Sequence, residues 1–300
     1  MAAADTPTFG ERAFVALQYL LPQHLLSRIV WRATRCETTW WKNALIGYFL
    51  RHFAVNMAEA AESDPFAYPS FNHFFTRALR AGARTVAQDP FCIVSPVDGI
   101  VSAAGAIEGD RLFQAKGHGY TLDQLLGDAA LARRFKDGWY STLYLAPHNY
   151  HRVHMPLAGT LAATVHVPGR LFSVNTTTTA QVPRLFARNE RVLCLFETDS
   201  GPLAVILVGA LFVGSMSTVW AGEITPHRDT RWSELAAKGA PIRLERGAEM
   251  GRFNMGSTVI LLLGSGVQWA PALVAGNPVR VGESIGRLSP GHSARRTGAV

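Results

Sequence analysis

The sequence predicts an α+β fold: N-terminal amphipathic helices followed by a mainly antiparallel β body, sandwich-like or barrel-like. Two observations predict it. Apolar residues within 11–57 recur mostly at spacings of three and four, as an amphipathic helix requires. From about Cys92, short β-rich runs alternate with Gly and Pro, the pattern of many short strands joined by turns. We therefore expect a helical region over residues 1–60 and a β-rich domain over residues 61–300.

The composition limits which classes of protein this chain can belong to. A hydrophobic content of 48% in 300 residues argues for a packed core and against disorder. A net charge of +7 suits nucleic acid or anionic lipid as a partner. The scattered Cys36, Cys92 and Cys194 lack CxxC spacing, which fits a reducing compartment and disfavours a zinc site. We expect no signal peptide, and no transmembrane helix because no apolar run reaches about 18 residues.

The N-terminal region has the composition of helices that lie in a lipid interface. A first helix is expected to break or kink at Pro22, and a second helix covers about 39–53. Arginines flank tryptophans along both segments, which suits an anionic membrane surface. The alternative is a helical hairpin packed on its own domain. Nucleic acid is disfavoured, because the basic residues are spread out and no binding motif accompanies them.

The β body is predicted element by element. A short helix begins after Ser70 as N-cap, residues 122–135 form the one clear helix of the body, and residues 176–179 form a loop. The predicted strands are 93–94, 99–106, 140–145, 159–167, 191–197, 203–208 and 211–220. Thr258–Leu263 is an unbroken apolar run, which suits a strand buried on both faces.

Gly256-Ser257 stands directly before that buried strand. Glycine leaves the peptide carbonyl unshielded and permits unusual backbone angles. The pair therefore suits a serine that attacks the peptide bond preceding it. A hairpin turn is the alternative, since Gly and Ser are ordinary turn residues.

Three further residues could act with Ser257. Asp98 lies in a tight Asp-Gly turn between two strands, and His151 and His154 follow an aromatic strand. Asp98, His154 and Ser257 would form a relay in which the acid orients the imidazole and the imidazole takes the hydroxyl proton. Metal binding by these histidines with His148 is disfavoured, because no carboxylate or cysteine lies close in sequence. An ordinary turn and a structural histidine remain alternatives.

The motifs resemble those of a known family. They are Phe71–Phe75, Pro96–Gly99, Gln114–His118, Tyr150–Pro156, Val167–Gly169, Leu171–Asn175, Leu185–Arg191, Val219–Gly222, and Gly251–Phe253 leading to Gly256–Thr258. Together they resemble the phosphatidylserine decarboxylase proenzymes of the bacterial membrane-associated type, over most of the chain. Met255 stands where the family usually has Leu, a change of similar volume that should not impair processing.

The resemblance implies a self-cleaving enzyme. Ser257, activated by His154 and Asp98, would attack the Gly256 carbonyl to give an ester, and β-elimination would cut the chain. The dehydroalanine left at position 257 would hydrolyse to a covalent pyruvoyl group and ammonia. The large chain 1–256 and the small chain 257–300 would stay together as a heterodimer that can dimerise further.

The resemblance also implies the substrate and its site. The pyruvoyl group would form a Schiff base with phosphatidylserine and accept electrons as CO₂ leaves, giving phosphatidylethanolamine. His151 is the candidate proton donor, and Ser173 with Phe172 the candidate substrate-binding residues. The protein would be peripheral on the cytoplasmic face of the cell membrane. A serine hydrolase using the same triad on an external substrate, and a non-catalytic basic membrane-binding module, are the alternatives.

Overall fold

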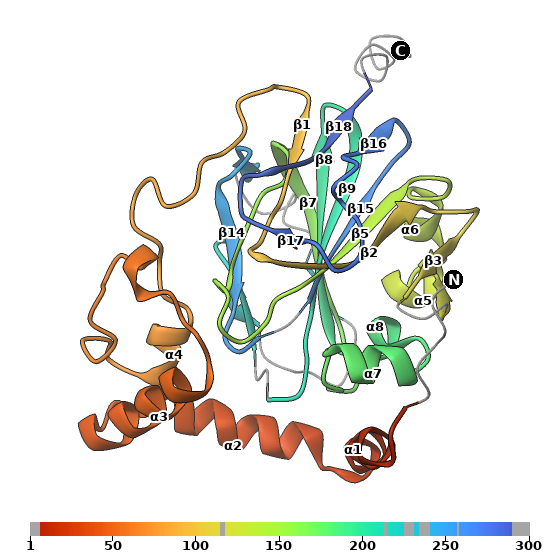
Figure 1. Cartoon of the computed structure of the whole chain (residues 1–300). Coiled ribbons are helices and arrows are strands. Elements are labelled where there is room, and N and C mark those ends of the chain that lie inside the picture. Colours follow the sequence, from red (N-terminus) through yellow and green to blue (C-terminus); the bar gives the residue numbers. More distant parts are fainter. Residues whose placement is uncertain are drawn as a thin grey trace.

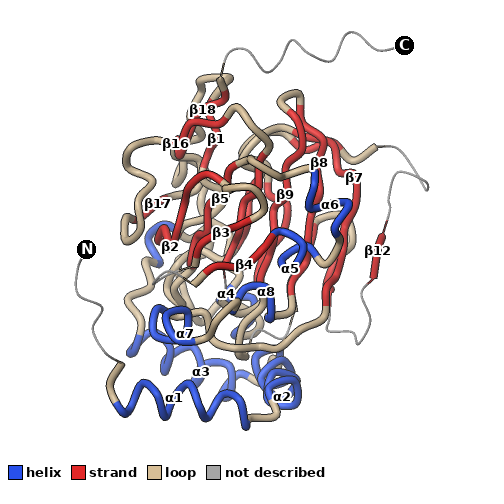
Figure 2. Tube along the Cα trace, turned by 90° about the vertical axis from the view of Figure 1, so that its right-hand side faces the viewer, coloured by secondary structure: helices blue, strands red, loops and turns tan. Residues whose placement is uncertain are grey.

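The computed structural model describes residues 7–114, 118–212, 215–224, 231–233, 241–256 and 258–289. Helices α1, α2 and α3 lie together at one end of the molecule, and the strands rise away from them (Figure 1). A view at right angles shows the same division, with α1, α2 and α3 below the sheets (Figure 2). The predicted α+β class is confirmed.

The helices are mostly short beyond the N-terminal region. Their bounds are α1 Phe9–Leu20, α2 Gln23–Arg35, α3 Thr39–His52, the 3₁₀ helix η1 Met57–Glu59, α4 Phe71–Phe75, α5 Leu122–Leu126, α6 Ala129–Arg133, α7 Thr176–Gln181 and α8 Leu185–Arg188. The predicted break at Pro22 is confirmed, because α1 ends at Leu20 and α2 begins at Gln23. Ser70 caps α4 as predicted, and its side chain accepts a hydrogen bond from the His73 amide.

Among the described residues the largest sheet has nine antiparallel strands. Its order is β12-β7-β8-β9-β15-β5-β2-β17, with β13 also paired to β7, and it does not close into a barrel. The bounds are β2 Gly99–Ala106, β5 Trp139–Tyr144, β7 Gly159–Val167, β8 Arg191–Thr198, β9 Gly201–Val208, β12 Arg231–Ser233, β13 Arg243–Leu244, β15 Thr258–Leu263 and β17 Pro278–Val279.

Three smaller sheets complete the body. One has the order β11-β10-β14-β6, one β1-β18-β16, and one joins β3 to β4. Their bounds are β1 Cys92–Val94, β3 Arg111–Phe113, β4 Gly119–Thr121, β6 Arg152–His154, β10 Met216–Thr218, β11 Gly222–Ile224, β14 Glu249–Phe253, β16 Val267–Trp269 and β18 Ser284–Leu288.

Strand β15 is the centre of the core. It pairs with β5 on one edge and β9 on the other, and all six of its residues are buried. Ile260 and Leu262 join an apolar cluster with residues of α5, α6 and α8, whereas Val259, Leu261 and Leu263 join a second cluster with residues of β6, β10 and β14. The sheet is therefore covered on both faces, by helices on one side and by smaller sheets on the other, which confirms the sandwich-like prediction.

Three local predictions are wrong. The predicted 176–179 loop is helix α7, because the Asn175 side chain caps its N-terminus by accepting from the Thr178 amide. The predicted helix 122–135 is two helices, because Gly127 takes a left-handed conformation (φ 71°) and ends α5. Of the predicted strand 211–220, the described residues form a strand only over Met216–Thr218, with a turn at 211–212. Within the described part of the chain, no helix is long and apolar enough to cross a membrane.

Candidate functional site

The candidate site surrounds Gly256. A Cβ atom placed on Gly256 would lie 3.4 Å from Cε1 of His151 and 3.9 Å from the Phe75 ring. Phe75 stacks on the His151 imidazole, with ring centroids 4.0 Å apart and an interplanar angle of 18°. The preceding Met255 packs against the helix-covered cluster of the core and against the aromatic cluster of α3 and α4. Residue 256 is thereby held against an imidazole, where glycine leaves the carbonyl side open.

His151 is an uncharged base with one open nitrogen. It is fully buried, and its Nε2 lies 3.1 Å from the Pro147 carbonyl oxygen. Because a carbonyl oxygen only accepts, Nε2 carries the proton and Nδ1 presents a lone pair. Nδ1 has no hydrogen-bond partner in the structure described. Burial lowers the pKa of His151 to about 3, and the Arg77 charge acts in the same direction.

We expect this buried imidazole to make stability fall with decreasing pH. The unfolded chain binds a proton at His151 near pH 6.5, whereas the folded protein binds it only near pH 3. Between these values the unfolded state holds more protons, so acidification from pH 6.5 to pH 5 should lower the free energy of unfolding by about 2 kcal/mol. Chemical unfolding at pH 7 and pH 5 measures the difference.

Two histidine variants separate this effect from general acid sensitivity. His151→Gln should remove most of the difference between pH 7 and pH 5. His52→Gln changes an exposed ring on α3 and should leave the difference as it is. An unchanged pH difference in His151→Gln would contradict the assignment.

His154 ends β6 and is held at both ring nitrogens. Its Nδ1 donates to the Gly247 carbonyl oxygen at 2.8 Å, so Nε2 accepts from the Tyr150 hydroxyl at 3.0 Å. Burial is the main cause that lowers the pKa of His154 and raises the pKa of Tyr150. His154 is therefore a neutral base whose free nitrogen is covered by a protonated phenol.

Asp98 lies in the turn between β1 and β2, where it is buried. Its carboxylate accepts from Nε of Arg84 at 3.0 Å, from Nη2 of the same guanidinium, and from the Val281 amide at 2.9 Å. Its negative charge also raises the pKa of His154, which opposes the larger effect of burial. The structure thus brings Asp98 into the electrostatic surroundings of His154, while its hydrogen bonds go to Arg84 and Val281.

The loop with Phe172 and Ser173 is fastened to the N-terminal helices. The Ser173 amide donates to Oε1 of Gln18 at 2.8 Å, and its hydroxyl lies 2.7 Å from the Thr178 hydroxyl. Phe172 is fully buried, with its ring centroid 4.8 Å from that of Tyr19. Phe172 therefore belongs to the core, and the Ser173 hydroxyl is bonded to Thr178 of α7.

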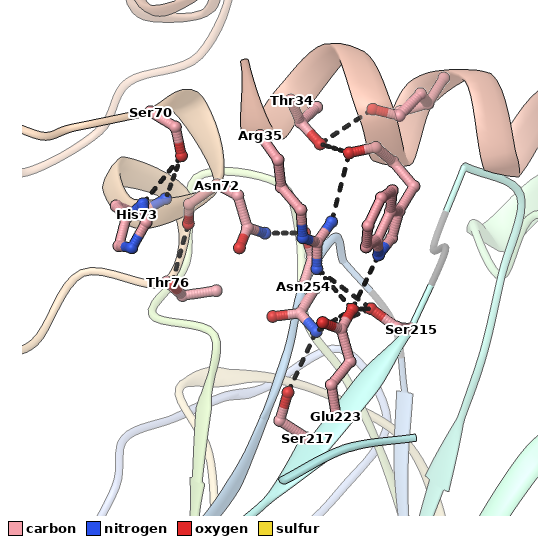
Figure 3. A network of polar contacts seen from close by, with 12 residues as sticks. Thr34, Arg35, Ser70, Asn72, His73, Thr76, Ser215, Ser217, Glu223 and Asn254 are labelled. Atoms are coloured by element: carbon pink, nitrogen blue, oxygen red, sulfur yellow. Dashed lines mark hydrogen bonds and ion pairs between the residues drawn. The ribbon is translucent and has the colours of Figure 1, made fainter. Parts of the chain in front are cut away.

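The backbone just before Gly256 is fixed by Asn254 (Figure 3). Its side-chain amide donates to the hydroxyls of Ser215 at 2.8 Å and Ser217 at 3.1 Å. Its carbonyl accepts from Nδ2 of Asn72 at 2.8 Å. Contacts from α4 on one side and from the β10 region on the other thus hold the peptide two residues before Gly256.

Sequence reasoning identified some of these groups and missed others. Ser257, the proposed nucleophile, lies outside the described residues. Tyr150 lay inside a motif, but its contact with His154 depends on the bend before β6. Asn254 lay between two motif segments without a role assigned to it, and Arg84 lay outside every motif. In the regions that the structure covers, no cluster of three or more His, Cys, Asp and Glu side chains could hold a metal ion.

Comparison with known proteins identifies the family. The family profile described as Phosphatidylserine decarboxylase matches residues 71–287, and one described as PSD matches residues 13–54. A Phosphatidylserine decarboxylase proenzyme of Pseudomonas aeruginosa (strain LESB58) is 55% identical over 284 residues, which cover 93% of this chain and 98% of that protein. The proenzyme of Alkalilimnicola ehrlichii is 56% identical over 285 residues, covering 94% and 98%.

A chain with these relatives is a decarboxylase. The chain belongs to the phosphatidylserine decarboxylase family.

Proposed function

We propose that this protein decarboxylates phosphatidylserine to phosphatidylethanolamine and CO₂, using a pyruvoyl group that it makes from Ser257 by cutting itself after Gly256. The observation that carries the proposal is the packing of Gly256 against His151, a neutral base with an open nitrogen. The relatives are named proenzymes, which supports a precursor that is processed.

In the cutting step, the Ser257 hydroxyl oxygen attacks the Gly256 carbonyl carbon and gives its proton to Nε2 of His154; the Gly256–Ser257 C–N bond then breaks as the Ser257 nitrogen takes up that proton, which leaves an ester. Loss of the α-proton of residue 257 and of the Gly256 carboxylate cuts the chain by β-elimination, and water converts the resulting dehydroalanine to the pyruvoyl group and ammonia. Nε2 of His154 accepts from the Tyr150 hydroxyl in the structure, so the serine hydroxyl must take the place of the phenol. The Asp98 carboxylate favours the imidazolium that results, because its negative charge raises the pKa of His154. Tyr150 is thus a positioning residue that keeps the base neutral and oriented before the step.

The fold explains how the two products would stay together. Strand β15 belongs to the small chain 257–300, whereas its neighbours β5 and β9 belong to the large chain 1–256. Backbone hydrogen bonds run along both edges of β15, and its side chains are buried on both faces. These contacts need no covalent link, so we infer a stable heterodimer of the two chains.

The residues around Gly256 fit a pyruvoyl group at position 257. The open Nδ1 of His151 is an orphaned buried acceptor, and the site needs such an atom. When present, the pyruvoyl carbonyl supplies an electrophile for the substrate amine and a sink for the electrons that CO₂ leaves behind. The substrate amine arrives as an ammonium ion, and Nδ1 of His151 would accept a hydrogen bond from it. His151 is the proton donor that we propose for the carbon that loses CO₂.

Substrate binding is the role we propose for Phe172 and Ser173. The Ser173 hydroxyl would bind the headgroup carboxylate or phosphate by exchanging its bond with Thr178. Phe172 would support this loop from within the core, where its ring packs on Tyr19 of α1. Because Gln18 and Tyr19 hold the loop, the substrate site is tied to the N-terminal helices.

The N-terminal helices present a surface suited to a lipid interface. Large apolar side chains exposed on them are Phe9, Phe14, Leu17, Tyr19, Leu20, Leu25, Ile29, Trp40 and Tyr48. Exposed arginines accompany them at positions 28, 32 and 51. Apolar side chains that enter the headgroup region, together with basic residues, bind anionic membranes. We therefore propose peripheral association of region 1–60 with the cytoplasmic face of the cell membrane, and no nucleic-acid partner.

A charge placed in this surface should weaken membrane binding. Leu20 is 83% exposed at the end of α1, so Leu20→Glu removes an apolar contact and adds repulsion from anionic lipid. Losing one such side chain costs about 1.5–3 kcal/mol, a decrease of roughly 10- to 100-fold in affinity for vesicles of anionic lipid. Co-sedimentation measures this affinity. Val274→Glu changes an exposed apolar residue of the β body and should bind as the unchanged protein does. Equal losses in both variants would contradict docking through the helices.

Intact mass and a CO₂-release assay test the proposed function together. We expect two chains, with a carbonyl-reactive group at the start of the smaller one, and release of CO₂ from phosphatidylserine vesicles. An active protein that remains a single chain, with Ser257 labelled by a fluorophosphonate, would instead identify a serine hydrolase.

A further inference from the structure

A network of side-chain hydrogen bonds ties the N-terminal helices to the loop that contains Phe172 and Ser173. This loop covers residues 168–175 between β7 and α7, and α1 lies beside α7 (Figure 1). Three consecutive amides of the loop donate to side-chain oxygens: Leu171 to Gln23 at 2.9 Å, Phe172 to Asn189 at 3.1 Å, and Ser173 to Gln18 at 2.8 Å. Gln18 of α1 and Gln23 of α2 are both buried. Two of these three contacts therefore come from the N-terminal helices.

Gln18 also acts on the Ser173 hydroxyl, through Thr178 of α7. The Ser173 amide can only donate, so it faces Oε1 of Gln18, and Nε2 is the donor that lies 3.2 Å from Oγ1 of Thr178. Oγ1 of Thr178 lies 2.7 Å from Oγ of Ser173, and either hydroxyl can donate in that contact. Since Thr178 accepts from Gln18, its own hydrogen is available for Ser173. In that arrangement the hydrogen of the Ser173 hydroxyl is free to donate to a ligand.

The surroundings of the loop are positively charged. The guanidinium carbons of Arg170 and Arg188 lie 5.7 and 5.1 Å from the ring centroid of Phe172. Both guanidinium groups donate to oxygens of Tyr19, which are uncharged, so these bonds leave the two charges uncompensated. Glu11 of α1 also contacts α7, but its carboxylate closes the capping box of its own helix. An oxyanion that reaches the loop therefore meets a positive potential.

We propose that Gln18 is a positioning residue of the headgroup site: it fixes the Ser173 amide and, through Thr178, frees the Ser173 hydroxyl to donate to an oxyanion of the lipid headgroup. Gln23 supports the same loop at Leu171. The inference rests on the proposed function, because it concerns the serine assigned there to the headgroup. The exchange at Ser173 then needs only a change in which hydroxyl donates, and the two oxygens stay in contact. The helix that exposes apolar side chains to lipid thereby also shapes the headgroup site.

Removing the hydrogen bonds of Gln18 should weaken the use of substrate. Gln18→Met keeps an unbranched side chain of similar length and removes both the donor and the acceptor. We expect kcat/KM for phosphatidylserine in mixed micelles to fall about 3- to 10-fold, as for one lost neutral hydrogen bond. Thr178→Val keeps the shape of the side chain without its hydroxyl and should cause a similar loss. Gln268→Met changes an exposed glutamine of β16 and should leave kcat/KM unchanged.

A double-mutant cycle separates positioning of the hydroxyl from general support of the fold. Ser173→Ala removes the hydroxyl and keeps the amide. In the Ser173→Ala background, Gln18→Met should lower kcat/KM by no more than about twofold, because the group that Gln18 positions is already absent. The same 3- to 10-fold loss in both backgrounds would show that Gln18 only holds α1 against the body, and would overturn the inference. Normal kcat/KM in Ser173→Ala alone would overturn it as well.

Two further measurements accompany the kinetics. Intact mass should show that Gln18→Met is cut as completely as the unchanged protein, and co-sedimentation should show equal binding to vesicles of anionic lipid. A variant that is lost from the vesicles would assign Gln18 to membrane docking and reject its role at Ser173. If Gln18→Met does not accumulate as folded protein, the cycle of Thr178→Val with Ser173→Ala decides by the same criterion. If the unchanged protein is itself uncut and releases no CO₂, the proposed function fails instead.

Discussion

Ser257→Ala should remain one uncut chain of 300 residues and release no CO₂ from phosphatidylserine. Alanine has no hydroxyl, so nothing can attack the Gly256 carbonyl, and no electrophilic carbonyl can form at position 257. The loss should be complete within the limit of the assay, because every later step needs that group. Denaturing electrophoresis with intact mass measures the cut, and CO₂ release from vesicles measures the activity.

A second serine of the small chain is the control. Ser289 is exposed just after β18, and Ser289→Ala should be cut and active like the unchanged protein. The variant at 257 should still fold, since the described pairing of β15 with β5 and β9 covers all six residues of Thr258–Leu263. A Ser257→Ala protein that is folded, uncut and fully active would refute the proposed mechanism.

Asp98→Asn should slow self-cleavage by about 10- to 100-fold. The neutral amide keeps the size of the side chain but removes the charge that raises the pKa of His154. We expect less than complete loss, because the hydrogen bonds of Asp98 go to Arg84 and Val281 and the charge acts on His154 through space. The time course of chain cutting after synthesis in a cell-free system measures the rate.

Asp98→Asn removes both the ion pair with Arg84 and the negative charge near His154, and the effects of these two losses on cleavage must be separated. The Asp98–Arg84 pair is nearly buried, with side chains 9% and 11% exposed, so breaking it costs about 3 kcal/mol of stability. Glu59→Gln removes the other carboxylate bound to Arg84, at 2.7 Å, and serves as the matched control. The cleavage rate of Glu59→Gln should differ from that of the unchanged protein by no more than about twofold, because Glu59 is more exposed and its ion pair contributes less. Equal slowing in both variants would show that Asp98 acts only by holding Arg84.

The elements that the sequence predicted best are those specified by a local pattern. Thr258–Leu263 is an apolar run in which polar and apolar residues do not alternate. Such a run predicts a strand that is covered on both faces, and the structure buries all six residues. The wrong predictions were decided by single residues. Gly127 ends α5 because it can adopt a left-handed conformation, and Asn175 starts α7 although four threonines disfavour a helix.

The chemistry of the site was less predictable than its residues. The sequence does not reveal which imidazole lies against Gly256. It is His151, because Phe75 of α4 stacks on the His151 ring and holds it there. The imidazoles of His151 and His154 are neutral because they are buried. The burial of a given residue cannot be read from its position in the sequence. Arg84 comes from a segment without periodicity, so its pairing with Asp98 could only be seen in the folded chain.

The position of β15 in the middle of the large sheet has a consequence for how the protein can be renatured. Before cutting, the strand is tethered to the partners between which it inserts, and folding is a reaction of one molecule. After the proposed cut, a denatured sample would contain two separate polypeptides, and recovery would require an encounter between them. Its rate should therefore depend on dilution, and the isolated large fragment would expose two unpaired, apolar sheet edges that favour aggregation. Once cut, the protein would therefore not refold efficiently after it is denatured.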